Sequence, residues 1–168
     1  LVGIVMDLTE RRAGERWAMA EAAAHYEQAL EMLAQLPATQ ATRKAERDLV
    51  LALGNVLIAS HGYTAPRTGA VFDRARVVCE ELDDTTNLIR VANGQWSYHL
   101  MRSEVDQARA VADDLLRRDA VAPSLELGLA GHRLLGASML QEGRLGEAQA
   151  HLDRAAALLE HAGPQQTV

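Results

Sequence analysis

The sequence contains one cysteine and six histidines, whose side chains are suited to nucleophilic catalysis or metal binding. A cysteine nucleophile needs a nearby histidine as its base, and a zinc site on a helix needs ligands at a spacing such as i, i+4. No two histidines have that spacing, and nothing in the sequence places one beside Cys79. We therefore expect no catalytic residue and no metal site, and we expect Cys79 to be a buried apolar group. The histidines should lie at the surface or be partly packed: His25, His61, His99, His132, His151 and His161.

The glycines and acidic residues do not predict a cofactor site either. No GxxxxGK[ST] motif is present, and Gly143 and Gly146 lie between two helical patterns rather than after a strand. Acidic residues gather at positions 80–84, which we interpret as a solvated turn at the end of a helix. A site for a cation or a basic partner is the alternative. The sequence thus predicts no cofactor.

Charge and composition restrict the class of protein. The chain has 17 Lys and Arg against 23 Asp and Glu, a formal net charge of −6, which argues against a nucleic-acid partner. No apolar run approaches the roughly 20 residues of a membrane-spanning helix. A single cysteine fits a reducing compartment, so we expect a cytoplasmic protein without membrane contact. Because the chain begins with Leu1 rather than Met, we expect it to be a piece of a longer or processed protein.

The composition and periodicity predict an all-helical chain. Alanine and leucine dominate the 48% of apolar residues, and apolar residues recur with the 3.6-residue period of amphipathic helices. We expect eight helices in four antiparallel pairs: 2–15 with 18–36, 43–60 with 64–82, 86–102 with 104–118, and 125–142 with 146–161. The pairs span about 2–36, 43–82, 86–118 and 124–161, within an array of residues 1–164 that is followed by a frayed tail, 165–168. We expect Thr64, Ser103 and Ser124 to be helix N-caps.

Small residues at fixed spacing indicate how the helices of a pair pack. Gly136 is followed after 12 residues by Ala148, then after four by Leu152 and after three by Ala155. Helices that approach within about 8–10 Å need small side chains at the contact, and this spacing is typical of tetratricopeptide repeats. Related positions recur upstream at an offset of about 40 residues, although Trp96 stands where Gly136 stands and predicts looser packing there. The predicted fold is an all-α, α-α superhelix of the tetratricopeptide type, with a HEAT-like or other αα-solenoid as the alternative.

In a tetratricopeptide superhelix the first helix of each pair lines the inner surface, which gives candidate binding residues. We predict a partner groove formed by Asn55, Arg90, Asn93, Leu100, Arg133, Leu140 and Gln141. Amides would bond a peptide backbone, and arginines would bind a carboxylate; an ordinary solvated face is the alternative interpretation. An apolar stripe near the start of the chain favours a homodimer, and it consists of Ile4, Val5, Met6 and Leu8.

Four segments together resemble one protein family: AGERWAMAEAAAHYEQALEMLAQLP, LALGNVLIASHGYTAPRTGAVFDRARVVCEELDD, GQWSYHLMRSEVDQARAVADDLL and GHRLLGASMLQEGRLGEAQAHL. Over about residues 13–160 the chain resembles the C-terminal tetratricopeptide-repeat region of large bacterial signalling proteins, in which a class III adenylyl/guanylyl cyclase domain is joined to an AAA-type ATPase. The family's catalytic residues lie in its other domains, so the resemblance implies no enzymatic activity for this chain. It implies a non-catalytic protein–protein interaction and regulatory module that binds a protein or peptide, including other domains of the same parent protein. Related repeat tails occur in ATP-dependent transcription regulators, so a helical sensor arm of such a regulator is the alternative.

Overall fold

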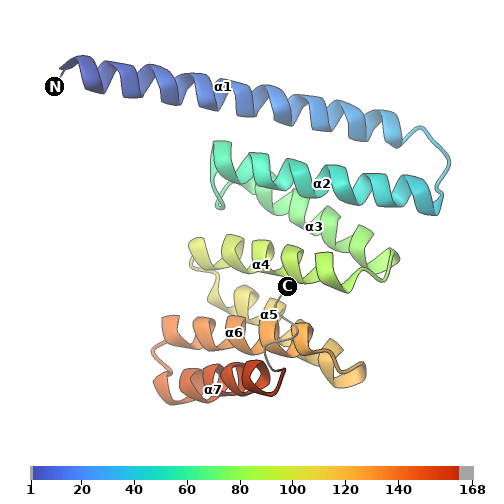
Figure 1. Cartoon of the computed structure of the whole chain (residues 1–168), viewed down its shortest axis with the longest axis vertical. Helices are drawn as coiled ribbons and strands as arrows, with labels where there is room; N and C mark the ends of the chain where they lie inside the picture. Colours follow the sequence, from blue (N-terminus) through green and yellow to red (C-terminus); the bar gives the residue numbers. More distant parts are fainter. Residues whose placement is uncertain (1, 163–168) are drawn as a thin grey trace. The chain divides into compact units, whose positions relative to one another are not determined.

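The computed structural model describes the backbone of residues 2–162, and the side chains of residue 14 and residues 17–162. Within these residues the chain is all-helical, with seven helices and no strand (Figure 1). It divides into two compact units, Leu1–Leu82 and Asp83–Val168. In each unit, consecutive helices pack against one another as an α-α superhelix requires, which confirms the predicted fold class.

The first unit contains α1 (Val2–Leu33), α2 (Gln40–His61) and α3 (Pro66–Glu81). Helix α2 packs against both of the others. A reciprocal cap fixes its start, because the Thr39 hydroxyl accepts a hydrogen bond from the Thr42 amide at 3.2 Å and the Thr42 hydroxyl accepts one from the Thr39 amide at 2.8 Å. The buried apolar residues of this unit are Ala23, Leu30, Val50, Leu53, Leu57, Phe72, Ala75, Val78 and Cys79. Cys79 is therefore buried as predicted.

Helix α1 corrects the predicted first pair. The expected helices 2–15 and 18–36 are one continuous helix that ends at Leu33, and Figure 1 shows an unbroken ribbon. The residues between the two expected helices include no proline and no capping side chain. Gly14 is the one weak helix former nearby, and a single glycine costs a helix only about 1 kcal/mol relative to alanine. The described chain therefore has seven helices instead of eight, and α1 has no antiparallel partner within residues 2–36.

The second unit contains α4 (Thr85–Met101), α5 (Val105–Val121), α6 (Leu125–Gln141) and α7 (Leu145–Ala162). Each helix packs against the next, and α4 also lies against α6. The predicted close approach at Gly136 is confirmed: a Cβ atom there would lie 2.9 Å from Leu152 Cγ and 3.1 Å from the Ala148 carbonyl oxygen. Ala148 is fully buried and Ala155 is nearly so. These small residues allow α7 to lie directly on α6.

The turns α4–α5 and α6–α7 have the same backbone. The second residue of each turn has a left-handed backbone conformation, with φ of 62° at Ser103 and 73° at Gly143. In both turns this residue donates its N–H to the carbonyl three residues back, and the next residue donates to the carbonyl five residues back. The prediction of Ser103 as an N-cap is therefore wrong: Ser103 lies in the turn that ends α4, and Glu104 is the N-cap of α5.

Of the other two predicted N-caps, one is confirmed and one is wrong. Ser124 caps α6 as expected, because its hydroxyl accepts a hydrogen bond from the Leu127 amide. Thr64 is not the N-cap of α3; that position is Ala65, which directly precedes Pro66 at the first helical position. Proline fixes its own φ at a helical value, so α3 begins at Pro66 and the cap falls one residue before it.

Trp96, where the sequence predicts looser packing, connects α4 to α6. The half-buried Trp96 ring packs against the core of the second unit. Its indole N–H donates a 2.9 Å hydrogen bond to the Ser138 hydroxyl, which in turn donates a 3.0 Å bond to the Leu134 carbonyl. Ala108 and Ala112 on α5 are fully buried. The large ring thus reaches across to α6.

Two predictions lie outside the described residues. These are the apolar stripe at Ile4, Val5, Met6 and Leu8, whose side chains are not described, and the tail 165–168. Among the described residues, no helix combines the length and the apolar character that are needed to cross a membrane.

Candidate functional site

The predicted groove residues of the second unit lie on one face of α4 and α6. The Arg133 guanidinium on α6 donates a hydrogen bond to the Asn93 side-chain oxygen on α4, which brings together two residues that are 40 positions apart. Residues at the i+3 and i+4 spacings from this pair share its side of each helix. We call this surface the α4–α6 face, and it consists of Arg90, Asn93, Ser97, Leu100, Met101, Arg133, Ala137, Leu140 and Gln141.

Two arginines of this face are bound to amides rather than to carboxylates. Arg90 Nη1 donates to the Asn87 side-chain oxygen at 3.2 Å, and Arg133 donates to Asn93. Asn93 is itself fixed, because its Nδ2 donates to the Ile89 carbonyl at 2.9 Å. Both arginines are exposed. Since neutral amides cannot compensate a guanidinium charge, the face carries two positive charges in a chain whose net charge is −6.

Apolar side chains occupy the other end of the α4–α6 face. Met101 is 62% exposed at the end of α4, and Leu140 is 46% exposed near the end of α6. Leu100 beside them is half-buried, and Gln141 is exposed. The face is therefore cationic in the first half of its helices and apolar at their ends.

The remaining predicted residue, Asn55, lies elsewhere. It is exposed on α2 in the first unit, so it is not part of the α4–α6 face. Six of the seven predicted groove residues thus share one surface, and their 40-residue offset is the signal by which the sequence could place them.

The charged groups at the hairpin turns of the second unit, in contrast, compensate one another. Arg109 and Arg144 both lie 3.0 Å from the Glu142 carboxylate. At the other turn, His99 and Arg102 each lie 2.8 Å from Glu104. Hydrogen bonds from His99 and Arg102 hold the pKa of Glu104 below its ordinary value. These turns therefore present little uncompensated charge beside the α4–α6 face.

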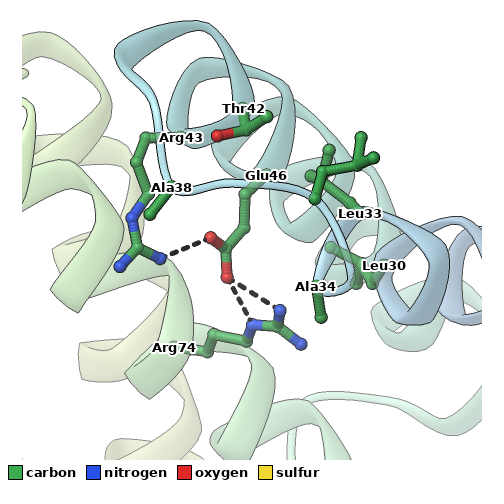
Figure 2. Close-up of a pocket in the computed structure, with 9 residues that line it drawn as sticks. Leu30, Leu33, Ala34, Ala38, Thr42, Arg43, Glu46 and Arg74 are labelled. Carbon is green, nitrogen blue, oxygen red and sulfur yellow. Dashed lines mark hydrogen bonds and ion pairs between the residues drawn. The ribbon is translucent and has the colours of Figure 1, made fainter.

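The first unit holds a pocket of about 310 Å³ that the sequence did not predict (Figure 2). Its lining residues are Leu30, Leu33, Ala34, Leu36, Ala38, Thr42, Arg43, Glu46 and Arg74. The Glu46 carboxylate points between two guanidinium groups, with Arg43 at 2.7 Å and with Nε and Nη2 of Arg74 at 2.9 and 2.7 Å. Arg43 also lies 3.0 Å from Glu81. The two positive charges are therefore balanced by two negative charges.

Glu46 is the most enclosed member of this cluster, with 13% of its side chain exposed. Burial raises the pKa of its carboxyl group, but hydrogen bonds from Arg74 and Arg43 more than offset burial and hold the pKa below the ordinary value. The cluster links α2 to α3, and its two guanidinium charges are matched by the carboxylates of Glu46 and Glu81. Sequence spacing reveals only the Arg43–Glu46 pair, because Arg74 lies 28 residues from Glu46 and reaches it through packing.

Two histidines whose pairing no sequence pattern predicts are in contact. His132 Nδ1 on α6 and His151 Nδ1 on α7 lie 2.9 Å apart, although 19 residues separate them. Within the described part of the chain, no group of three or more His, Cys, Asp and Glu side chains could hold a metal ion.

Comparisons of this chain with protein families, with curated proteins and with solved structures return no match.

Proposed function

We propose that this chain is a non-catalytic protein–protein interaction module and that its α4–α6 face binds an acidic, partly apolar segment of a partner protein. The observation that carries the proposal is the state of Arg90 and Arg133, which are exposed and hydrogen-bonded only to amides in the described residues. A guanidinium group binds carboxylates through paired, charge-assisted hydrogen bonds. Both arginines can exchange a neutral amide for an ionised partner.

The apolar end of the face supports the same type of partner. Met101 and Leu140 are exposed large side chains, and an incoming leucine or phenylalanine would cover them. Met101 lies 11 residues after Arg90 and Leu140 lies 7 residues after Arg133, which is about two to three helical turns. This favours a segment whose acidic residues and apolar residue are separated by a similar distance. Such a segment binds along a helical groove through a few anchoring side chains.

The resemblance described above supports a place for this module in a larger protein. We propose that it is a cytoplasmic tetratricopeptide-type region of a bacterial signalling protein with cyclase and ATPase domains. The partner segment would then belong to another protein or to another domain of the same parent chain.

Selection from a random peptide library tests the proposed binding face. Wild-type protein should enrich peptides that combine Asp or Glu with a large apolar residue. For an enriched peptide, Arg90→Gln and Arg133→Gln should each weaken binding by about three- to tenfold, because an exposed charge pair contributes about 1 kcal/mol. Binding should also weaken with added salt.

Arg117→Gln is the matched control. Arg117 is an arginine on α5 with 67% of its side chain exposed, and it already pairs with Asp114 at 3.0 Å. Its removal should leave peptide affinity unchanged. Enriched peptides without acidic residues, or equal binding to the Arg90→Gln/Arg133→Gln double variant, would refute the proposed face.

A further inference from the structure

Helix α7 carries a row of leucines that is open to solvent. Leu145, Leu152 and Leu159 are 66%, 37% and 49% exposed. Seven residues, about two helical turns, separate each leucine from the next, so all three lie on one side of α7. Ala156, which is also exposed, lies on the same side between the last two leucines. We call the surface formed by these four residues the α7 leucine stripe.

The equivalent side of α5 is covered by α6. Helices α5 and α7 begin 40 residues apart, so the counterparts of Leu145, Leu152, Ala156 and Leu159 are Val105, Ala112, Leu116 and Asp119. Ala112 is fully buried. A Cβ atom at Gly131 of α6 would lie 2.6 Å from Leu116 Cδ2, and one at Gly128 would lie 3.0 Å from Asp119 Oδ2. The same side of an equivalent helix therefore already binds a helix within this chain.

The sizes of the side chains differ between the two surfaces. On α5 the large residue Leu116 meets Gly131 of α6, whereas α7 has the small residue Ala156 at that position. A helix that packs on the α7 leucine stripe thus meets a small side chain between two leucines. Because packed helices place large side chains opposite small ones, such a helix can present a large apolar residue to Ala156.

An acidic edge borders the α7 leucine stripe. Asp153 and Glu160 are exposed, and each directly follows a leucine of the stripe, which rotates it by about 100° to the same edge. Charge complementarity therefore favours a partner with basic residues along this edge. A second copy of the chain does not provide them, because a two-fold contact joins the same patch of both copies and brings their acidic edges together.

We propose that the α7 leucine stripe binds an amphipathic helix of a partner protein, one with a large apolar residue opposite Ala156 and with Lys or Arg beside Asp153 and Glu160. The contact would be helix against helix, as between α5 and α6. The α4–α6 face favours an acidic segment, so the two surfaces select partners of opposite charge. This proposal does not depend on the function proposed for the α4–α6 face.

Two designed peptides test the charge and the apolar contact. Both are helices of about 20 residues with leucines along one side, and they differ only in carrying Lys or Glu at the edges of that side. Fluorescence anisotropy with the full chain should show the Lys peptide binding at least about tenfold more tightly than the Glu peptide. The double variant Asp153→Asn/Glu160→Gln should reduce this preference by about three- to tenfold.

Leu145→Ser and Leu159→Ser should each weaken binding of the Lys peptide by about tenfold, because each removes a leucine that the peptide covers. Val121→Ser is the matched control, since Val121 is 87% exposed at the end of α5, and it should leave the affinity unchanged. Arg90→Gln/Arg133→Gln should not weaken binding of the Lys peptide. This result separates the α7 leucine stripe from the α4–α6 face.

A measurement on the wild-type chain avoids any dependence on how the variants fold. The Lys peptide should shift the NMR methyl signals of Leu145 and Leu159 and leave that of Met101 on the α4–α6 face in place. The proposal is overturned if these leucine signals do not move, if the Ser variants bind the Lys peptide as the wild type does, or if the Glu peptide binds equally well. A dimer in sedimentation that Leu159→Ser dissociates would also overturn it, because a second copy would then cover the stripe.

Discussion

Gly136 is the position at which a single added methyl group most directly tests the packing of α6 on α7. In Gly136→Ala the new Cβ would lie 2.9 Å from Leu152 Cγ, whereas carbon atoms in contact are normally about 3.5–4.0 Å apart. It would also lie 3.1 Å from the Ala148 carbonyl oxygen. Leu152 is 37% exposed and can turn outward, but the carbonyl can move only if α7 moves.

The expected loss of stability follows from two opposing effects. Overpacking a tight contact costs about 1–3 kcal/mol, and replacing glycine by alanine inside a helix recovers up to about 1 kcal/mol. We therefore expect Gly136→Ala to lower the free energy of unfolding of the second unit by about 1–2 kcal/mol. Adding Leu152→Ala should relieve the contact with the side chain and leave the contact with the carbonyl.

Urea unfolding followed by tryptophan fluorescence and far-UV circular dichroism measures this effect. Trp96 reports on the second unit because it packs against that unit's core, whereas Trp17 in the first unit is 69% exposed. Gly146→Ala on α7 is the matched control, since a Cβ there meets nothing within 4 Å, and it should be neutral or stabilising. If Gly136→Ala unfolds at the same or a higher urea concentration than the wild type, close packing at Gly136 is refuted.

Three further predictions concern charge, backbone and thiol chemistry. The pKa of Glu46 is lowered in the folded chain, so its ion pairs stabilise the first unit fully at pH values above the ordinary carboxyl pKa of about 4.3, and this stability is lost as pH falls through the lower folded pKa. Glu46→Gln should therefore reduce the pH dependence of the urea midpoint over that range. An unchanged pH dependence would contradict this assignment. Ser103→Gly should stabilise and Gly143→Ala should destabilise the second unit, each by about 1 kcal/mol, because both positions have positive φ; equal urea midpoints would exclude backbone strain there. The fully buried Cys79 thiol should react with a disulfide reagent only after the first unit unfolds, and rapid labelling in native buffer would show that it is accessible.

Local sequence signals predicted much of the fold. Helical periodicity placed the last six helices close to their observed ranges, and the spacing from Gly136 to Ala155 identified a contact that the structure contains. Two local signals were ambiguous. Gly14 is a weak helix former that the surrounding helix tolerates. Ser103 followed by an acidic residue has the pattern of a helix start, although its backbone conformation belongs to a helix end.

Some side-chain contacts could be predicted from the repeat spacing, and others could not. Asn93 and Arg133 could be placed on one face because their offset equals that of the repeated helices. The Arg74–Glu46 ion pair and the His132–His151 contact have no such signal. They depend on how far one helix slides along its neighbour, and that register is set by the packing of many apolar side chains together.

The shared turn geometry of α4–α5 and α6–α7 has a consequence for chain length. A further hairpin added at the same 40-residue interval would follow a hairpin with the same turn conformation. It would also have a buried alanine at the equivalent position, as Ala108 and Ala148 are in the two existing hairpins. Duplication of one such hairpin therefore requires no new arrangement of packed helices. Proteins of this kind can therefore vary the number of their hairpins while the surface that each hairpin offers to solvent changes independently.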